Sequence, residues 1–482
     1  QFLWHKGIVA QAPAAHSADA ARSPDAAQRT SGMPAPAISV PAESVAVLPF
    51  ANLSGDKAQQ YFSDGLSEDL INTLSQFEGL KVISRNSAFQ FRDSKDSSAV
   101  IGRKLGVAHL LEGSVQKLGD EVRISATLVN AADGSVAWSQ QYDKPYTDLF
   151  ALQDAITKAV SGALQAELLA SHATVQSERP PSDNLAAWQA YQQGKFYAAR
   201  NTQADIHKAL DLFATATRLG PRYAAAYARM SIGWTGLAGQ YLARTAQREA
   251  YAKARAAADK ALALAPDLAL AHVVRGDLLL IADFDWTGAQ AEYQRAAQLA
   301  PNDAAVLFRL GNMDATLGRV QSAVALTRKA LAADPLHAGW YIWLSSYLAG
   351  LGQLDAAQQA TTKAIELQPA ADAFHAQVAV VATLRGDSKA ALAAAQQETS
   401  PLLRRLALAL ATRIGPDAKA ADAALQTLIA RDSDQAPYQI AEVYALRRDP
   451  DNMFKWLDRA WTERDPGVGY LLYDPFILRY RA

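Results

Sequence analysis

Between residues 44 and 168, short apolar runs alternate with amphipathic stretches. Residues 44–50 form a β-branched apolar run that ends at a proline, which predicts a buried strand. Residues 62–77 place Leu66, Leu70 and Leu74 at helical spacing, which predicts an amphipathic helix. The same patterns predict further strands at 80–84, 108–117, 121–130 and 135–142, and helices at 99–105 and 149–168. Two strand–helix units followed by a meander indicate an α/β domain with a mixed sheet over residues 44–168.

From residue 184 onward, helical periodicity replaces the strands, and one marker pattern recurs. Each copy holds two alanines seven residues apart and a proline five residues after the second alanine, and the last three intervals between prolines are 35, 34 and 34 residues. Such a period is typical of a helix–turn–helix solenoid. The five copies are Ala209, Ala216 and Pro221; Ala254, Ala261 and Pro266; Ala289, Ala296 and Pro301; Ala323, Ala330 and Pro335; and Ala357, Ala364 and Pro369.

The spacing of these markers has a physical reason. Alanines seven apart lie on the same helix face and let a partner helix approach closely, whereas the proline ends the helix. One helix pair cannot bury its apolar stripe alone, but stacked pairs share a continuous core. We therefore predict an all-α solenoid over residues 184–482, with degenerate repeats toward the carboxyl end. About eleven extra residues around 237–247 predict longer helices or a longer loop in the second pair.

These repeats resemble the tetratricopeptide repeat family. Counting Ala304 as the first residue, Leu307, Leu310, Gly311 and Gly318 fall where that family places its core and small residues. The resemblance implies a concave groove for a protein or peptide partner. Carried onto two repeats, its lining is Ala305, Phe308, Asn312, Ala315 and Thr316, then Gly339, Ile342, Ser346, Ala349 and Gly350.

The implied groove is small-sided and mostly neutral, so it suits an apolar or neutral segment, including one of the chain's own domains. We expect Asn312→Arg or Ser346→Arg to abolish partner binding without lowering the melting temperature. Aromatic residues crowd the same stretch at Trp340, Tyr341, Trp343 and Tyr347. Packing is the favoured interpretation of these aromatics, and a ligand platform is the alternative.

Two stretches have the composition of linkers. Residues 1–43 are rich in Ala, Pro and Ser, which predicts a flexible tether, and residues 169–183 contain Pro180 and Pro181 among polar residues. The chain begins with Gln1, which we interpret as a fragment or a processed chain. Its first ten residues fit either the end of a transmembrane helix or an end without a role.

Composition narrows the function classes. The net charge is −1 and no segment is strongly basic, so we expect no nucleic-acid binding by this segment. The chain has no cysteine, and its eight histidines never stand three to five residues apart. No phosphate-binding loop, HExxH or GxSxG motif occurs. We therefore predict no catalytic residues, no metal and no cofactor.

A second resemblance covers about 100 residues. The segments SVAVLPF, YFSDGLSEDL, LKVISR, IGRKLGVAHLLEGSV and GDEVRISATLVNAADGSVAWSQQYD resemble, in this order, the TolB amino-terminal-like (FlgO-like) domain. The resemblance implies a domain on the periplasmic side of bacterial membrane proteins, commonly followed by tetratricopeptide repeats. It also implies an upstream effector, either a winged-helix domain as in CadC-like regulators or a class III adenylate cyclase.

These observations favour a sensory and interaction module of a membrane-anchored bacterial regulator, located on the periplasmic side of the inner membrane. The module would bind a protein or small ligand and relay this binding to a transcriptional output. A membrane would be reached only through an upstream segment, and a homodimer is compatible with this interpretation. The alternatives are a periplasmic scaffold without signalling output and a hydrolase within the α/β domain, which only scattered carboxylates support. Sequence alone leaves open whether the two domains touch.

Overall fold

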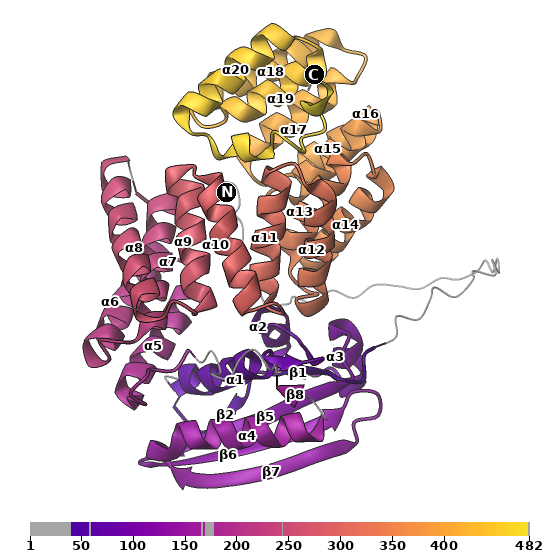
Figure 1. Cartoon of the computed structure of the whole chain (residues 1–482). Coiled ribbons are helices and arrows are strands. Elements are labelled where there is room, and N and C mark those ends of the chain that lie inside the picture. The colour runs from indigo at the N-terminus through magenta and orange to yellow at the C-terminus, as the bar shows by residue number, and fades with distance from the viewer. Residues whose placement is uncertain (1–39, 57–58, 165–166, 169–177, 243, 481–482) are drawn as a thin grey trace, which may run out of the picture.

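The computed structural model describes residues 40–56, 59–164, 167–168, 178–242 and 244–480. The predicted tether at 1–43 and linker at 169–183 therefore lie mostly outside the described residues. Figure 1 shows a mixed-sheet domain, here called the sheet domain, and above it a long helical solenoid. This architecture confirms the predicted fold class. Among the described residues, no helix combines the length and apolarity needed to cross a membrane.

The main sheet of the sheet domain has the order β4-β1-β5-β6-β7, with β2 also paired to β5. The β4–β1 and β1–β5 pairs are parallel, whereas β5, β6 and β7 form an antiparallel meander. The strands are β1 (Ser44–Val47), β2 (Ala51–Asn52), β4 (Lys81–Val82), β5 (His109–Leu118), β6 (Glu121–Asn130) and β7 (Val136–Pro145).

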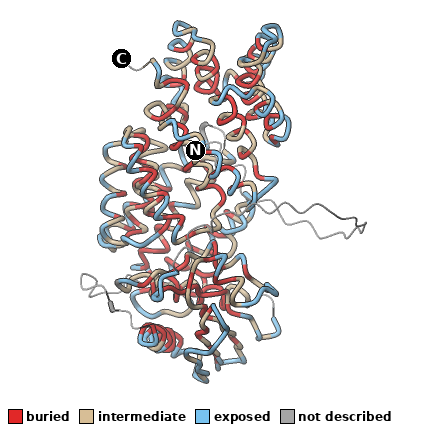
Figure 2. Tube along the Cα trace, turned by 90° about the vertical axis from the view of Figure 1, so that its right-hand side faces the viewer, coloured by how far each residue is buried: buried red, intermediate tan, exposed pale blue. Residues whose placement is uncertain are grey.

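Alternation along the strands supplies a core on each face of this sheet. Val45 and Val47 join the cluster beneath α1 (Gln60–Leu74) and α4 (Leu149–Ala163), whereas Ala46 joins the cluster beneath α2 (Arg85–Ala88) and α3 (Ser98–Leu105). The 3-10 helices η2 (Phe89–Phe91) and η3 (Tyr146–Asp148) complete the domain. Figure 2 shows buried residues concentrated within the sheet domain and on the packed faces of the helices.

Two predicted helices extend too far. The helix predicted to reach residue 77 ends at Leu74, and the one predicted to reach residue 168 ends at Ala163. The reason is a second, two-stranded sheet in which β3 (Phe77–Glu78) pairs antiparallel with β8 (Glu167–Leu168). Backbone pairing between these distant segments outweighs the local helical pattern.

In the part of the solenoid that the structure describes, there are eight antiparallel helix pairs. All ten marker alanines are at most 1% exposed, and each repeat proline stands two residues beyond the end of its helix. The pairs are α5 (Leu185–Ala198) with α6 (Gln203–Leu219), α7 (Ala224–Gln240) with α8 (Arg244–Leu264), α9 (Ala269–Leu278) with α10 (Trp286–Leu299), α11 (Ala304–Thr316) with α12 (Val320–Ala333), α13 (Ala338–Gly350) with α14 (Leu354–Leu367), α15 (Phe374–Leu384) with α16 (Ser388–Gln397), α17 (Pro401–Arg413) with α18 (Ala418–Asp432), and α19 (Pro437–Arg447) with α20 (Pro450–Glu463).

The extra residues of the second pair lengthen its helices, since α7 has 17 residues and α8 has 21. A short π-helical segment, η4 (Leu279–Asp283), links α9 to α10.

After α20 the chain turns back instead of ending outside the stack. This carboxyl-terminal tail, residues 466–480, contains η5 (Pro466–Tyr470) and η6 (Leu478–Tyr480). Tyr470 packs edge-on against Trp343 at 5.5 Å between ring centroids, and Tyr473 packs against Tyr347 at 5.3 Å. The tail therefore lies against α13, within the concave surface of the solenoid.

Candidate functional site

One contact between the two domains is a tryptophan of the first repeat. Trp188 of α5 is fully buried in the core of the sheet domain, edge-on to Phe62 and Phe150 with centroids 5.8 and 6.1 Å away. Its Nε1 donates to Asp69 Oδ2 at 3.0 Å. The aromatic contacts and the hydrogen bond to a carboxylate fix the orientation of α5 on α1.

A second contact joins α2 to the turn between α12 and α13. The Ser84 N–H donates to the Ala333 carbonyl at 2.8 Å, and the Leu336 N–H donates to Ser87 Oγ at 2.9 Å. Ser87 in turn donates to the Asp334 carboxylate. Leu336 also packs against the core beneath α2 and α3. The solenoid thus places a residue in each core of the sheet domain, Trp188 in one and Leu336 in the other.

Between these two contacts lies a cavity of about 450 Å³, here called the interdomain cavity. This volume is within the range typical of ligand-binding pockets. Its wall on the sheet domain comes from α1 and residues 84–86, and its wall on the solenoid from α7, α9, α11 and α13. Glu178, which precedes the first repeat, also lines it.

Ion pairs concentrate where the two walls meet. Glu68 forms ion pairs with Arg85, whose Nε lies 3.0 Å from Oε2, and with Lys195, whose Nζ lies 2.8 Å from Oε1. Glu178 accepts from Arg229 Nη2 at 3.1 Å and from Lys195 Nζ at 3.3 Å. Lys195 therefore bridges a carboxylate of the sheet domain and one next to the solenoid, so a movement of either domain breaks an ion pair.

These contacts shift three pKa values. Burial alone would raise the pKa of Glu178, but Arg229 and Lys195 lower it to about 2. The pKa of Glu68 is also below its usual value, because Lys195 and Arg85 outweigh its burial. Asp69, one residue away, behaves in the opposite way: burial raises its pKa to about 6 despite Lys195, and the charges of Glu68 and Glu178 add to the rise.

The solenoid wall combines helix amino termini with an aromatic stack. The first turns of α9, α11 and α13 line the cavity, which brings their backbone N–H groups to one side of it. Trp340 stacks on His337 at 4.0 Å and on Phe308 at 4.8 Å between ring centroids. The buried Trp340 Nε1 has no hydrogen-bond partner among the described residues. Arg309, whose Nε donates to Asp277 at 3.0 Å, stands beside this stack.

This arrangement has the groups needed to bind a polar or aromatic ligand. It offers arginine and indole donors, carboxylate acceptors and a stacking surface. Among the described residues, no group of three or more His, Asp or Glu side chains could hold a metal ion.

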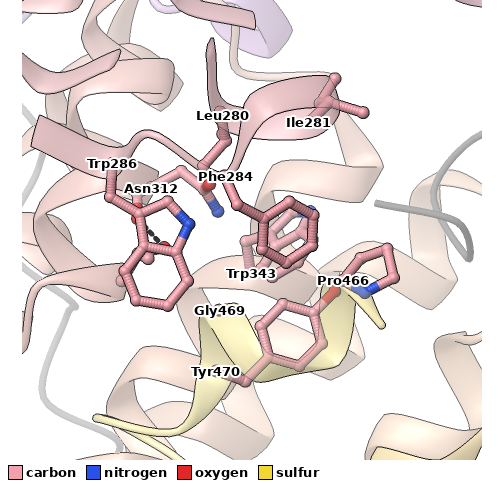
Figure 3. Close-up of a pocket in the computed structure, with 10 residues that line it drawn as sticks. Leu280, Ile281, Phe284, Trp286, Asn312, Trp343, Pro466, Gly469 and Tyr470 are labelled. Carbon is pink, nitrogen blue, oxygen red and sulfur yellow. Dashed lines mark hydrogen bonds between the residues drawn. The ribbon is translucent and has the colours of Figure 1, made fainter. Parts of the chain in front are cut away.

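The residues of the predicted groove do not form one site. Ala305 lines the interdomain cavity, whereas Asn312 and Thr316 line a separate, smaller pocket against the tail (Figure 3). Phe308 is taken up by the stack on Trp340, and Ala315 is fully buried. Farther along, Ile342 packs against the cluster of Ala364 and Phe374, Ser346 Oγ donates to the Ile342 carbonyl at 3.1 Å, and Gly350 lies under the tail.

The tail changes what is expected of Asn312. Its Nδ2 donates to the buried Tyr347 hydroxyl at 2.9 Å. An arginine there removes this hydrogen bond and extends toward the pocket beside the tail. We now expect Asn312→Arg to lower the melting temperature, contrary to the expectation from sequence.

Sequence reasoning missed the charged residues of the interdomain cavity. Arg229 and Arg309 each stand eight residues after a repeat proline, where the other three corresponding positions hold Val274, Trp343 and Gln377. A charge at a position that is uncharged in the other three repeats was the available signal. Glu178 had no such signal, because the composition around it is that of a linker.

Comparison with known proteins supports both parts of the architecture. Residues 41–159 match the family described as "HilA/YgeH-like transcriptional regulator, second domain". Residues 340–370 match a tetratricopeptide repeat. The chain therefore combines a domain similar to one found in transcriptional regulators with tetratricopeptide repeats, and this combination indicates a protein-interaction module.

Individual relatives match parts of the chain. "Putative adenylate cyclase 3" of Rhizobium meliloti (strain 1021) is 35% identical over 195 residues, or 39% of this chain and 32% of that protein. The chain thus spans about a third of this relative. Solved structures that match part of this chain include PilF of Pseudomonas aeruginosa, which is 16% identical and covers 50% of this chain and 96% of its own, with a TM-score of 0.37. Yeast Tom70 is 16% identical and covers 61% of this chain and 63% of its own, with a TM-score of 0.37.

Proposed function

We propose that this chain is the sensory and interaction module of a membrane-anchored bacterial regulator, and that its ligand or partner segment binds in the interdomain cavity. The observation that carries the proposal is the position of this cavity. Both domains contribute its walls, so an occupant contacts the sheet domain and the solenoid at once.

The position of the cavity provides a way to relay binding. An occupant that fits one relative position of the domains better than another shifts the population toward that position. The Lys195 ion pairs and the Asp334 contact with Ser87 are the interactions that such a shift would rearrange. The sheet domain then passes the change to an effector elsewhere in the protein.

Transcription is the output we favour, because the family matched by residues 41–159 is one of transcriptional regulators. The finer assignment of this region to the TolB amino-terminal-like domain, and its place in the periplasm, rest on the sequence resemblance and on the tether-like composition of residues 1–43. A nucleotide cyclase is the second candidate effector, which the name of the Rhizobium relative supports. A scaffold without signalling output is the third interpretation.

The effector is tested by reading the gene upstream of the codon for Gln1. A winged-helix domain beyond a membrane span supports the transcriptional proposal, a cyclase domain supports the second candidate, and a signal peptide alone supports the scaffold.

The cavity is tested with a reporter of the intact protein's output in its native host. Ala305→Trp fills the cavity, whereas Ala214→Trp adds the same bulk to an exposed position of α6. We expect the first variant to lose the difference between induced and uninduced output, and the second to keep it. A normal response from a stably expressed Ala305→Trp protein would exclude this cavity as the sensing site.

A further inference from the structure

A separate small pocket lies on the concave surface of the solenoid, away from the interdomain cavity. Four aromatic side chains line it: Phe284, Trp286, Trp343 and Tyr470. They come from the turn between α9 and α10, from the start of α10, from α13 and from the tail. Figure 3 shows their rings gathered around a common space, with Pro466 beside Tyr470. The pocket holds about 40 Å³.

The backbone at one wall of this pocket is unusual. The π-helical segment η4 contributes Leu280 and Ile281, and the next residue, Phe284, has a left-handed conformation with φ of 57°. A residue with a Cβ seldom adopts this conformation, so the surrounding structure must hold it. Wide helical turns of this kind often occur at functional sites.

The lining is uncharged. None of the ten described residues that line the pocket is acidic or basic, and its polar side chains include those of Asn312 and Thr316. A primary ammonium or a carboxylate would therefore lose its hydration without an opposite charge in the lining to replace it. Aromatic faces, in contrast, attract a cation without being charged themselves.

One aromatic ring of the pocket already attracts a cation from the chain. The Arg464 guanidinium lies 5.7 Å from the centre of the Phe284 ring, and its Nη1 donates to the Ala282 carbonyl at 3.2 Å. Arg464 does not line the pocket.

We propose that this aromatic pocket binds a trimethylammonium group, such as that of choline or a betaine. A quaternary ammonium has no N–H groups to satisfy, its methyl groups make apolar contacts, and its charge is attracted to the ring faces. A cavity needs roughly 10–15 Å³ to hold one water-sized group, so the pocket accommodates about three or four heavy atoms. That is the size of the trimethylammonium group.

Binding here would involve the tail directly. Pro466, Gly469 and Tyr470 of the tail face α11 and α13 across the pocket. A bound trimethylammonium group therefore bridges the tail and the concave surface.

The test compares three ligands that differ in charge and hydration. Choline, its uncharged carbon analogue 3,3-dimethylbutan-1-ol and ethanolamine are titrated against the whole chain by calorimetry. We expect choline to bind at least about tenfold more tightly than either of the other two, as a desolvated cation–π contact requires. Equal binding of choline and 3,3-dimethylbutan-1-ol, or no binding of choline at all, overturns the proposal.

Variants locate the binding. Trp343→Leu keeps an apolar side chain but removes the aromatic face, and we expect it to weaken choline binding about tenfold, whereas Trp343→Phe retains most of it. The control is Trp138→Leu in the sheet domain, which should leave binding unchanged. If Trp343→Leu fails to fold, the chemical shift of the choline methyl protons is measured in the presence of the unmodified protein. Binding in an aromatic pocket moves this resonance upfield, and an unshifted resonance contradicts the proposal.

Discussion

Asp69 is a buried carboxylate at the contact between α1 and α5. Trp188 Nε1, Gln153 Nε2 and Gln192 Nε2 donate to it at 3.0, 3.1 and 3.2 Å. These three donors stabilise its charged form, yet burial still raises its pKa to about 6. The contact between the domains therefore includes a carboxyl group whose pKa is raised toward neutrality.

Asp69→Asn should remove the pH dependence of stability that this carboxyl group causes. Because the folded pKa lies above the unfolded value, the folded protein binds more protons than the unfolded chain between pH 4 and 6, and the unfolding free energy falls as pH rises through this window. A rise of two units corresponds to about 3 kcal/mol. In urea unfolding, we expect the unfolding free energy of the unmodified protein to fall by this amount as pH rises from 4 to 6, relative to that of Asp69→Asn. An identical pH dependence of the two proteins would contradict this assignment.

Glu178 supplies a control in a different pH window. Its folded pKa of about 2 lies below the unfolded value, so its stabilising effect is complete above about pH 4.5 and is lost as pH falls toward 2. Glu178→Gln should change the pH dependence mainly in that lower window, with a smaller change between pH 4 and 6, because the Glu178 charge also raises the pKa of Asp69.

The sequence predicted the burial of residues whose contacts follow from the helical spacing within their own repeat. The marker alanines are buried as expected, because helical spacing alone decides which face they occupy. Asp69 and Glu178 were not predicted, because their partners lie 84 to 123 residues away for Asp69 and up to 51 residues away for Glu178. No local pattern encodes such a pairing.

At the scale of elements, the tail is the part that local sequence does not place. Most strands and helices up to α20, although not β3 and β8, follow apolar periodicity, and β6 begins and ends at the predicted residues. The tail has no period, and what holds it are aromatic contacts to α13 and a hydrogen bond from Tyr438 to Asp474 at 3.0 Å. The groove that sequence assigned to a partner is thus partly filled by the chain itself.

Gly350→Ala tests the position of the tail. A Cβ at residue 350 would stand 2.2 Å from the Tyr473 carbonyl oxygen, so the tail must move. We expect the unfolding free energy to fall by about 1–3 kcal/mol, the usual cost of overpacking.

Gly236→Ala in α7 is the matched control, because its Cβ would meet only the Gln240 amide at 4.0 Å. That change should be neutral or stabilise by up to about 1 kcal/mol, as an alanine does within a helix. Thermal unfolding of both variants measures the difference. Equal stability of the two would show that the tail does not lie over Gly350.

At the scale of the whole molecule, the two domains share buried residues. The contact at α5 is dominated by packing, whereas the contact at Asp334 is polar: Asp334 is 2% exposed and accepts from Ser87 and from Asn86 Nδ2 at 3.2 Å. Sequence could not show this arrangement, because a repeat pattern describes how each repeat meets the next and not what else packs against the stack.

Asp334→Ala should loosen the polar contact and leave the packed one. The change leaves the buried Ser87 hydroxyl without this acceptor, which costs about 1–3 kcal/mol locally. Since the chain has no cysteine, Lys95→Cys and Lys329→Cys can carry a pair of fluorophores on the two domains. We expect single-molecule energy transfer to report a broader range of distances in the Asp334→Ala protein.

Asp355→Ala provides the comparison, because Asp355 is exposed and its carboxylate pairs with Arg385 within the solenoid. Its distance distribution should match that of the unmodified protein. A distribution that stays narrow in Asp334→Ala would mean that the packed contact alone sets the position of the sheet domain.

The end of the solenoid returns to its middle. Trp461 of α20 packs edge-on against Trp286 of α10 at 6.3 Å, and Arg464 donates to the Ala282 carbonyl. An open stack of repeats can be extended by force along its length, since each repeat touches only its neighbours. In this chain, the contacts of Trp461 and Arg464 join two distant repeats. A pulling force must break these contacts before the repeats between α10 and α20 can extend.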